Sequence, residues 1–154
     1  MTPFDAVAGV ANACQILPTV VTGGQPTAAQ IEALAAAGGA IVLDIRDPME
    51  PRPFDEALMV RRHGMEYVNI PVVAGTLSDG ELERILTTLR GAGNRTVFFH
   101  CGSGNRVGGA LIPYLMLDHG MEEEDAVQQA MRVGLRSPEL LEWGLDYAHR
   151  HAAP

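Results

Sequence analysis

The chain has very little cysteine and no excess of basic residues, and each shortage excludes a class of protein. Only two cysteines, Cys14 and Cys101, occur in 154 residues, so a disulfide-stabilised scaffold is excluded, and their spacing matches no zinc-binding pattern. There are 19 acidic and 11 basic residues, and the resulting net charge of −8 opposes nonspecific binding to nucleic acid. We therefore expect no nucleic-acid partner and a reducing compartment, namely the cytoplasm.

Long hydrophobic runs and an export signal are also missing. No apolar run reaches the roughly 18 residues that a bilayer-spanning helix needs. Residues 1–5 lack the basic stretch of a secretory signal, and Asp5 interrupts the apolar segment that follows. The 5 histidines are not spaced along the sequence as the ligands of a metal site usually are. The sequence therefore predicts no membrane partner, no metal site and no cofactor.

Apolar residues, in contrast, are abundant. They make up 47% of the sequence, which is enough for one substantial core. We expect a single domain over residues 1–154, with its core at about 15–150. The expected elements alternate, which is typical of an α/β protein with a central, mostly parallel sheet flanked by helices. Strands are predicted at 16–22, 41–46, 67–72 and 96–100, and helices at 28–38, 54–63, 107–118, 122–133 and 138–150, with one more helix after Ser78.

Capping residues and prolines mark several predicted helix ends. Thr27 and Ser78 each precede a glutamine or glutamate three residues later, which is the capping-box pattern. Gly64 is expected to end the second predicted helix. Pro113 falls inside a predicted helix, where its missing N–H should bend the axis.

The most informative segment is TVFFHCGSGNR at residues 96–106, in which an apolar strand ends at Cys101 and a glycine-rich turn leads to Arg106. Gly102 and Gly104 permit positive φ angles, so that several N–H groups can turn toward one point. A helix that begins near Arg106 adds partial positive charge there, as does the guanidinium. These effects stabilise a thiolate, and we expect Cys101 to be largely ionised at neutral pH. The alternative is an unreactive cysteine that only packs in the core.

The HCGSGNR loop resembles the active-site loop of the cysteine-dependent phosphatase and rhodanese group. Three further segments narrow the resemblance: TGGQPT at 22–27, IVLDIR at 41–46 and YVNIPV at 67–72. Together the segments are similar to a bacterial phosphatase-like family related to the β-lactamase-hydrolase-like proteins, over roughly residues 15 to 150. This resemblance implies the fold of the protein tyrosine and dual-specificity phosphatases.

The same resemblance assigns roles to single residues. Cys101 becomes the catalytic nucleophile, and Arg106 becomes the clamp that binds the oxyanion. The phosphate-binding residues are Gly102, Ser103, Gly104, Asn105 and Arg106. His100 is expected to position the loop through hydrogen bonds, because an ionised thiolate needs no adjacent base. The implied partner is an anionic small-molecule or phosphoprotein substrate.

Three departures from the phosphatase pattern matter for the chemistry. Only 102–105 separate the cysteine from the arginine, one residue fewer than in typical tyrosine and dual-specificity phosphatases. This shorter spacing is rhodanese-like and suits a persulfide sulfur. Val107 stands where phosphatases have a serine or threonine that helps the thiolate leave, so only Ser103 remains for that role. The loop at 73–77 lacks the aspartate that usually protonates the leaving group.

Asp47, Glu50 and Asp79 are the carboxylates that remain as possible proton donors. Asp47 follows a predicted buried strand, and the carboxyl ends of parallel strands meet at one edge of the sheet, so it can approach Cys101. A turn residue before a proline is its structural alternative. Asp79 belongs to the S-x-x-E capping box, which explains it without chemistry.

Positive charge near Arg106 should stand out in an acidic protein. The arginines that can extend it are Arg46, Arg52, Arg61, Arg62, Arg132 and Arg136. Most charged side chains only solvate a surface, so each of these has a structural interpretation as well. Cys14 is interpreted as a small apolar residue, with a redox or sulfur-transfer role as the alternative.

Three functions remain open on this evidence. The first is hydrolysis of a phosphomonoester through a cysteinyl-phosphate intermediate. The second is sulfur transfer through a Cys101 persulfide. The third is an oxyanion-binding module with little or no turnover. The substrate and the oligomeric state are not predicted.

Overall fold

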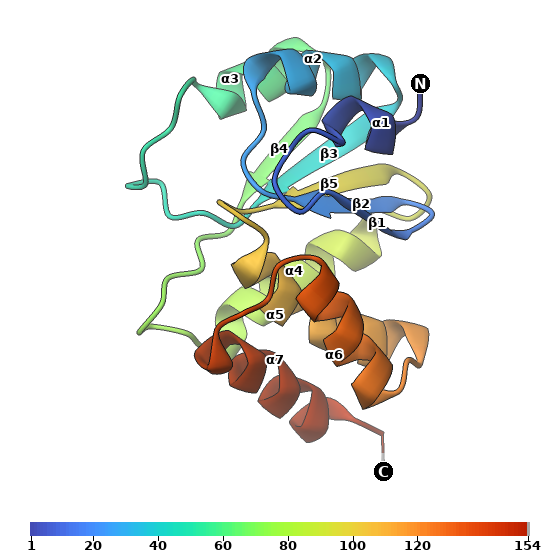
Figure 1. Cartoon of the computed structure of the whole chain (residues 1–154), viewed down its shortest axis with the longest axis vertical. Helices are drawn as coiled ribbons and strands as arrows, with labels where there is room; N and C mark the ends of the chain where they lie inside the picture. Colours follow the sequence, from blue (N-terminus) through green and yellow to red (C-terminus); the bar gives the residue numbers. More distant parts are fainter. Residues whose placement is uncertain (154) are drawn as a thin grey trace.

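A five-stranded sheet separates two layers of helices in the computed structural model, which describes residues 1–153 (Figure 1). The strand order is β1-β2-β5-β3-β4, with β1 antiparallel to β2 and all other neighbours parallel. The strands are β1 Cys14–Leu17, β2 Val20–Gly23, β3 Gly39–Asp44, β4 Glu66–Asn69 and β5 Thr96–His100. The expected mostly parallel sheet is therefore confirmed, with one antiparallel strand at its edge.

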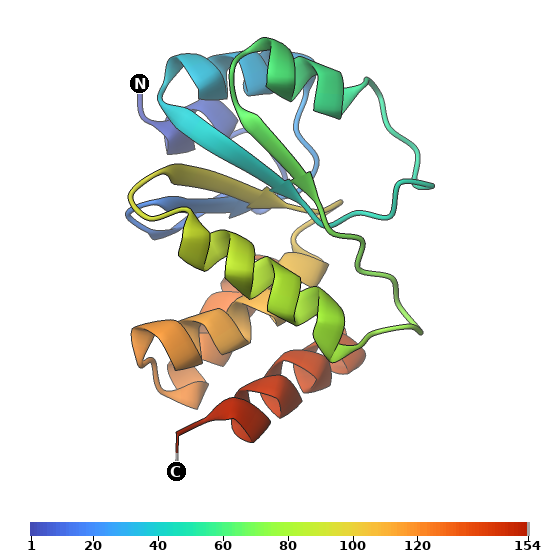
Figure 2. The same ribbon diagram turned by 180° about the vertical axis from the view of Figure 1, so that it is seen from behind.

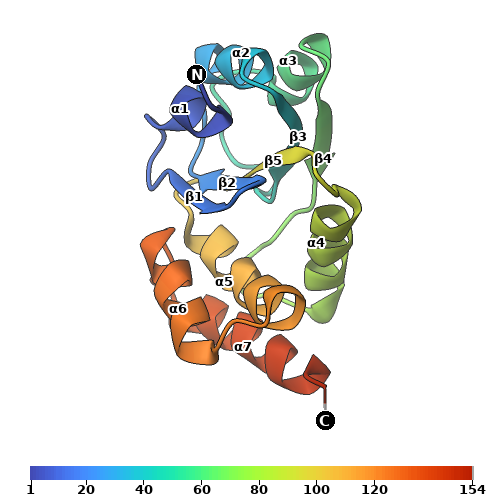
Figure 3. The ribbon, with the colours of Figure 1, turned by 90° about the vertical axis from the view of Figure 1, so that its right-hand side faces the viewer.

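The helices divide between the two faces of the sheet (Figures 1 and 3). One face is covered by α1 Pro3–Val7, α2 Ala28–Ala36 and α3 Glu56–Arg62, and the other by α4 Asp79–Gly91, α5 Asn105–Pro113, α6 Glu123–Arg132 and α7 Pro138–His151. A π-helical turn, Tyr114–Asp118, follows α5. No helix among residues 1–153 combines the length and the apolar character that crossing a bilayer requires.

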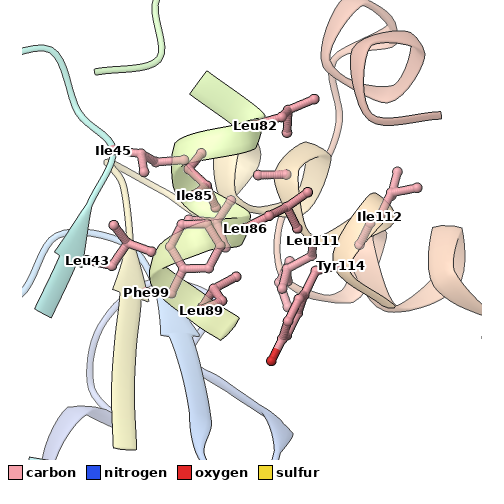
Figure 4. Packing of buried hydrophobic residues seen from close by; sticks show 14 of the residues in the cluster. Leu43, Ile45, Leu82, Ile85, Leu86, Leu89, Phe99, Leu111, Ile112 and Tyr114 are labelled. Carbon is pink, nitrogen blue, oxygen red and sulfur yellow. The ribbon is translucent and has the colours of Figure 1, made fainter. Parts of the chain in front are cut away.

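Each face of the sheet carries its own hydrophobic core. Successive side chains of a strand point to opposite faces, so Phe98 packs beneath α1–α3 while Phe99 packs against α4–α7. Figure 4 shows Phe99 beside Leu43 and the leucines and isoleucine of α4. Strand β5, which leads to Cys101, is therefore held from both faces at the centre of the sheet.

The predicted capping residues explain three of the helix ends. Thr27 forms a capping box with Gln30, and Ser78 forms one with Glu81. Gly64, after α3, has φ +80°, a left-handed conformation that glycine adopts at low cost. The starts of α2 and α4 and the end of α3 therefore lie where their capping residues predict.

Several predicted boundaries were wrong. The strand predicted at 16–22 is two strands of a hairpin that turns at Pro18, and α1 was not predicted. The strand predicted to reach residue 72 ends at Asn69, before Pro71, which lacks an N–H for the ladder. The helix predicted from near Arg106 to 118 starts at Asn105, and although its end at Asp118 is as predicted, it becomes π-helical after Pro113.

The carboxyl ends of the parallel strands meet at one edge of the sheet. The long loops that follow β3 and β4 project from this edge (Figure 2), beside the loop that follows β5. Side chains from three separate loops therefore come together there.

Candidate active site

Cys101 lies at the end of β5 with its side chain turned into the loop that follows. Its Sγ atom accepts a hydrogen bond from the N–H of Gly104 at 3.2 Å. Gly104 has φ +95° and is the N-cap of α5, so the sulfur faces the amino end of that helix. Cys101 is 0% exposed. The sulfur therefore forms the buried base of the loop.

The loop offers N–H groups that have no partner in the described part of the chain. Among residues 1–153, the amides of Gly102, Ser103, Asn105 and Arg106 make no hydrogen bond to another residue. Free N–H groups at the start of a helix form a binding site for anions, because both their hydrogens and the helix dipole present positive charge. The 102–106 segment, called the cradle below, can therefore bind an oxyanion next to the sulfur.

Residues distant in the sequence hold the cradle in shape. Asn12 Nδ2 donates to the Ser103 carbonyl at 2.7 Å, and the Gln25 N–H donates to the Gly102 carbonyl at 3.1 Å. A Cβ atom on Gly24 would lie 2.6 Å from that same carbonyl oxygen, so only glycine allows the approach. The TGGQPT segment is thus a support for the cradle.

Arg106 interacts both with the Cys101 sulfur and with Glu50 in the loop after β3. Its Nη1 and Nη2 atoms donate to the two carboxylate oxygens of Glu50 at 2.6 and 2.9 Å, and Nη1 also donates to the Val72 carbonyl at 3.4 Å. The hydrogen bond to Glu50 raises the pKa of Arg106, burial of the guanidinium acts in the opposite direction, and the charge of Cys101 raises it further. The hydrogen bond from Arg106 lowers the pKa of Glu50 against the effect of burial. The ion pair is therefore fully formed at neutral pH.

A cavity of about 330 Å³ opens beside Arg106. Its lining residues are Asp47, Glu50, Val72, Val73, Ala74, Asn105, Arg106, Ser137 and Leu140. Two of the three candidate proton donors, Asp47 and Glu50, are thus brought to the arginine. Asp79 is not, because it pairs with Arg150 and lines a different cavity.

A buried polar network lies behind the cradle. His100 contacts the Cys101 carbonyl oxygen through Nδ1 at 3.1 Å and Glu56 through Nε2 at 2.6 Å. Arg46 donates to Asp44 at 2.9 and 3.0 Å and to Glu56 at 3.0 Å. Burial alone would raise the pKa of Asp44, but the hydrogen bonds from Arg46 and the charge of His100 hold it well below its usual range. His100 therefore fixes the backbone at the nucleophile position and is itself fixed by Glu56.

This network contains the one group of residues within 1–153 that resembles a set of metal ligands. Oxygen and nitrogen atoms of Asp44, Glu56 and His100 all lie within 4.8 Å of one another. The guanidinium of Arg46, however, already donates to both carboxylates. A metal cation would have to occupy the place of this fixed positive charge, so the residues do not fit a metal.

The candidate arginines differ in their distance from the cradle. Arg46 and Arg52 bind Asp44, Arg61 lies over the ring of Tyr67, and Arg132 contacts Gln129 and the Gln15 carbonyl. Within residues 1–153, Arg136 is the candidate whose side chain contacts the cradle, through Nη2 to Ser103 Oγ at 3.1 Å. No hydrogen bond joins the Ser103 hydroxyl to Cys101 in that part of the chain, so this structure gives no contact for its expected role with the leaving thiolate.

Sequence reasoning missed several residues of this site. No local sequence pattern marks Asn12 or Glu56 as part of the site, because their hydrogen-bond partners lie 91 and 44 residues away in the sequence. Asp44 had a usable signal, since a charged residue at the end of a buried strand needs a partner. Cys14, as expected from its interpretation as a packing residue, is buried, and it forms no disulfide.

A comparison with protein-family models matches residues 12–141 to the family described as "DSP-PTPase phosphatase fused to NAD+ Kinase". No curated protein matches the chain. Among solved structures, a DUF442 candidate phosphatase from Shewanella putrefaciens CN-32 superposes with a TM-score of 0.83 at 18% identity, covering 97% of this chain and 99% of the other. Tk-PTP gives 0.75 at 21% identity, covering 92% and 98%.

A third similar structure is TpbA from P. aeruginosa, with a TM-score of 0.71 at 18% identity, covering 92% of this chain and 86% of the other. At these identities the structures bear on the fold alone, and they confirm the expected tyrosine and dual-specificity phosphatase fold. The comparisons support the phosphatase part of the expected resemblance. They lend no support to a link with β-lactamase-hydrolase-like or rhodanese proteins.

Proposed function

The chain belongs to the family of DSP-PTPase phosphatases fused to NAD+ kinase, and on that basis we propose that it hydrolyses a phosphomonoester through a cysteinyl-phosphate intermediate on Cys101. The observation that carries this proposal is the position of the Cys101 sulfur, which lies at the base of a cradle of unpaired N–H groups with a guanidinium at its rim. Nucleophile and oxyanion donors in one loop are the parts that phosphoryl transfer needs.

The proposed reaction has two steps. The Cys101 thiolate attacks phosphorus, and the bond from phosphorus to the ester oxygen breaks as that oxygen takes a proton and leaves as an alcohol. Water then attacks the cysteinyl phosphate, the sulfur leaves as a thiolate, and inorganic phosphate is released. In both steps the cradle and Arg106 stabilise the charge on the phosphoryl oxygens.

We assign the proton donor to Asp47. It lines the cavity beside Arg106, while the loop at 73–77 contains no carboxylate. Glu50, the other carboxylate there, is held ionised by Arg106. A general acid typically contributes about 10²–10⁴-fold, so Asp47→Asn should slow esters with poor leaving groups far more than para-nitrophenyl phosphate.

Sulfur transfer is a second candidate, favoured by the four-residue spacing between Cys101 and Arg106. In that reaction Cys101 takes the outer sulfur of thiosulfate, sulfite leaves, and cyanide accepts the sulfur as thiocyanate. The intermediate is a persulfide. It differs in mass from a phosphoryl group on the same residue, by about 32 against about 80 Da for the two covalent intermediates.

The test compares wild type, Cys101→Ser and a Cys14→Ser control, each with para-nitrophenyl phosphate and with thiosulfate plus cyanide. We expect phosphatase activity that is lost in Cys101→Ser and kept in Cys14→Ser, with a phosphoryl adduct on Cys101 in mass spectrometry. Thiocyanate formation with a persulfide adduct would favour the second candidate. Turnover that survives Cys101→Ser would refute both, and anion binding without turnover would indicate a binding module.

A further inference from the structure

Arg136, on the turn between α6 and α7, contacts the rim of the cradle. Its Nη2 atom donates to Ser103 Oγ at 3.1 Å, and its side chain is exposed. The mechanism proposed above does not use this arginine. Its guanidinium nevertheless contacts the side chain of Ser103, whose own N–H is one of the groups that would bind a phosphoryl group.

The backbone that carries Arg136 is fixed to the cradle. Asn105 Oδ1 accepts hydrogen bonds from the N–H groups of Arg136 at 2.9 Å and Ser137 at 3.3 Å. A Cβ atom on Gly134 would lie 2.8 Å from the Ser103 carbonyl oxygen, which shows how closely the turn is packed on the cradle. The guanidinium therefore extends from a rigid base, and only its own side-chain rotamers change its position.

The positive charge of Arg136 has no counterion among residues 1–153. No carboxylate lies within 4.0 Å of it in residues 1–153, whereas Arg106 is paired with Glu50. The protein as a whole carries a net charge of −8, so the positive charge that Arg136 adds beside the cradle stands out against an acidic background. A planar guanidinium with N–H groups still free is well suited to phosphoryl oxygens.

We propose that Arg136 binds a second phosphoryl group of the substrate while the cradle and Arg106 hold the first. The substrate class is then a phosphomonoester that carries two closely spaced phosphoryl groups. The proposal rests on the proposed function for the identity of the first group. The spacing must be short, because Arg136 and the cradle share Ser103 as a common contact.

Two anions that the enzyme does not consume test this proposal. Inorganic phosphate represents the first group alone, and methylenediphosphonate represents two linked groups. Binding of each to wild type, Arg136→Gln and Arg132→Gln is measured by calorimetry at one fixed salt concentration. Arg132 is the matched control, because it is an exposed arginine near the same turn whose side chain contacts Gln129 rather than the cradle.

We expect wild type to prefer methylenediphosphonate over phosphate by about tenfold, as a charge-assisted contact would give. Arg136→Gln should reduce this ratio to about twofold or less, and Arg132→Gln should leave it unchanged. A wild type without preference, an unchanged ratio in Arg136→Gln, or an equal loss in Arg132→Gln would overturn the proposal. Equal melting temperatures of the three proteins show that the comparison is between folded states.

The readout is independent of turnover, so the two proposals can fail separately. A protein that hydrolyses para-nitrophenyl phosphate but shows no Arg136-dependent preference refutes the second-phosphoryl site alone. A protein with the preference but without Cys101-dependent hydrolysis refutes the proposed reaction and leaves Arg136 as part of an anion-binding site.

Discussion

Two anionic groups compete for binding to Arg106: the carboxylate of Glu50 and the phosphoryl group of the proposed substrate. In this structure Glu50 binds both terminal nitrogens of the guanidinium, and Cys101 beneath it has no exposed surface. A substrate must therefore reach the sulfur against a group of the same charge. Glu50 makes entry of an anion less favourable for as long as it stays ionised.

Replacing Glu50 with glutamine should strengthen binding of inorganic phosphate. The change removes one negative charge from the guanidinium while keeping the size of the side chain, and we expect the inhibition constant of phosphate to fall by about three- to tenfold. Inhibition of para-nitrophenyl phosphate hydrolysis measures it. Glu139→Gln is the control, since that carboxylate accepts the Gly75 N–H rather than binding Arg106. Weaker phosphate binding in Glu50→Gln would show that Glu50 orients the arginine instead of competing for it.

The loop that follows β3 depends on a network of buried charges at its base. Asp44 ends the strand, and it accepts hydrogen bonds from Arg46, Arg52 and Tyr67. Through Arg46 and Glu56 the network continues to His100 and so to the carbonyl of Cys101. The conformation of the loop and that of the nucleophile are therefore connected through one set of ion pairs.

Replacing Asp44 with asparagine should destabilise the protein by about 3–5 kcal/mol, because Arg46 would lose a buried partner. The pKa of Asp44 is lowered on folding, so its stabilisation is complete above about pH 4 and is lost as the pH falls below that value. Urea denaturation at several pH values measures both effects. The stability of wild type should fall in acid more steeply than that of the variant.

Asp79→Asn is the comparison for this prediction. Asp79 also has a lowered pKa, caused by its hydrogen bond to Arg150, but its side chain is 43% exposed, whereas that of Asp44 is 0% exposed. A solvated ion pair contributes little, so this variant should resemble wild type. Equal losses in Asp44→Asn and Asp79→Asn would contradict the importance assigned to the buried network.

Local sequence patterns predicted the strands and helix ends that depend only on neighbouring residues. Strand β5 and the start of α7 follow from an apolar run and from a serine-proline cap, and both were confirmed. The hairpin around Pro18 was missed because its two strands read as one apolar run. The change of helix type after Pro113 depends on which carbonyls remain without donors, which a periodic pattern does not show.

The candidate site divides in the same way. The cradle, Cys101 and Arg106 lie in one short segment, so their spacing could be interpreted from sequence. The attachment of Glu50 to Arg106 spans 56 residues, and that of Asn12 to Ser103 spans 91. Such contacts follow from the strand order, in which β5 lies between β2 and β3, and a single sequence does not determine that order.

The two hydrophobic cores share three strands of the sheet, because β2, β3 and β5 each contribute side chains to both. Phe98 belongs to the core under α1–α3, and Phe99 belongs to the core under α4–α7. Because adjacent residues of β5 anchor both cores, neither core can come apart without disturbing the strand that carries Cys101. We therefore expect residues 1–154 to unfold as one cooperative unit.

Phe98→Ala tests this expectation. The change should cost about 3–5 kcal/mol. Its effect should also reach Trp143, which belongs to the opposite core and is the single tryptophan. Fluorescence of Trp143 and far-ultraviolet circular dichroism should therefore report the same lowered midpoint. A tryptophan transition that stays at the wild-type midpoint while circular dichroism shows two steps would contradict a single unit.

The close contact between the cradle and the α6–α7 turn bears on redesign of this enzyme. A Cβ atom on Gly104 would lie only 1.9 Å from the Val133 carbonyl oxygen, so any change of the loop that places a side chain at this point also requires the turn to move. A loop with five residues between the cysteine and the arginine, grafted from another phosphatase, would therefore have to be transferred together with the donor's own turn, the counterpart of residues 133–137 here. The length of the loop and the path of the turn are thus inherited together.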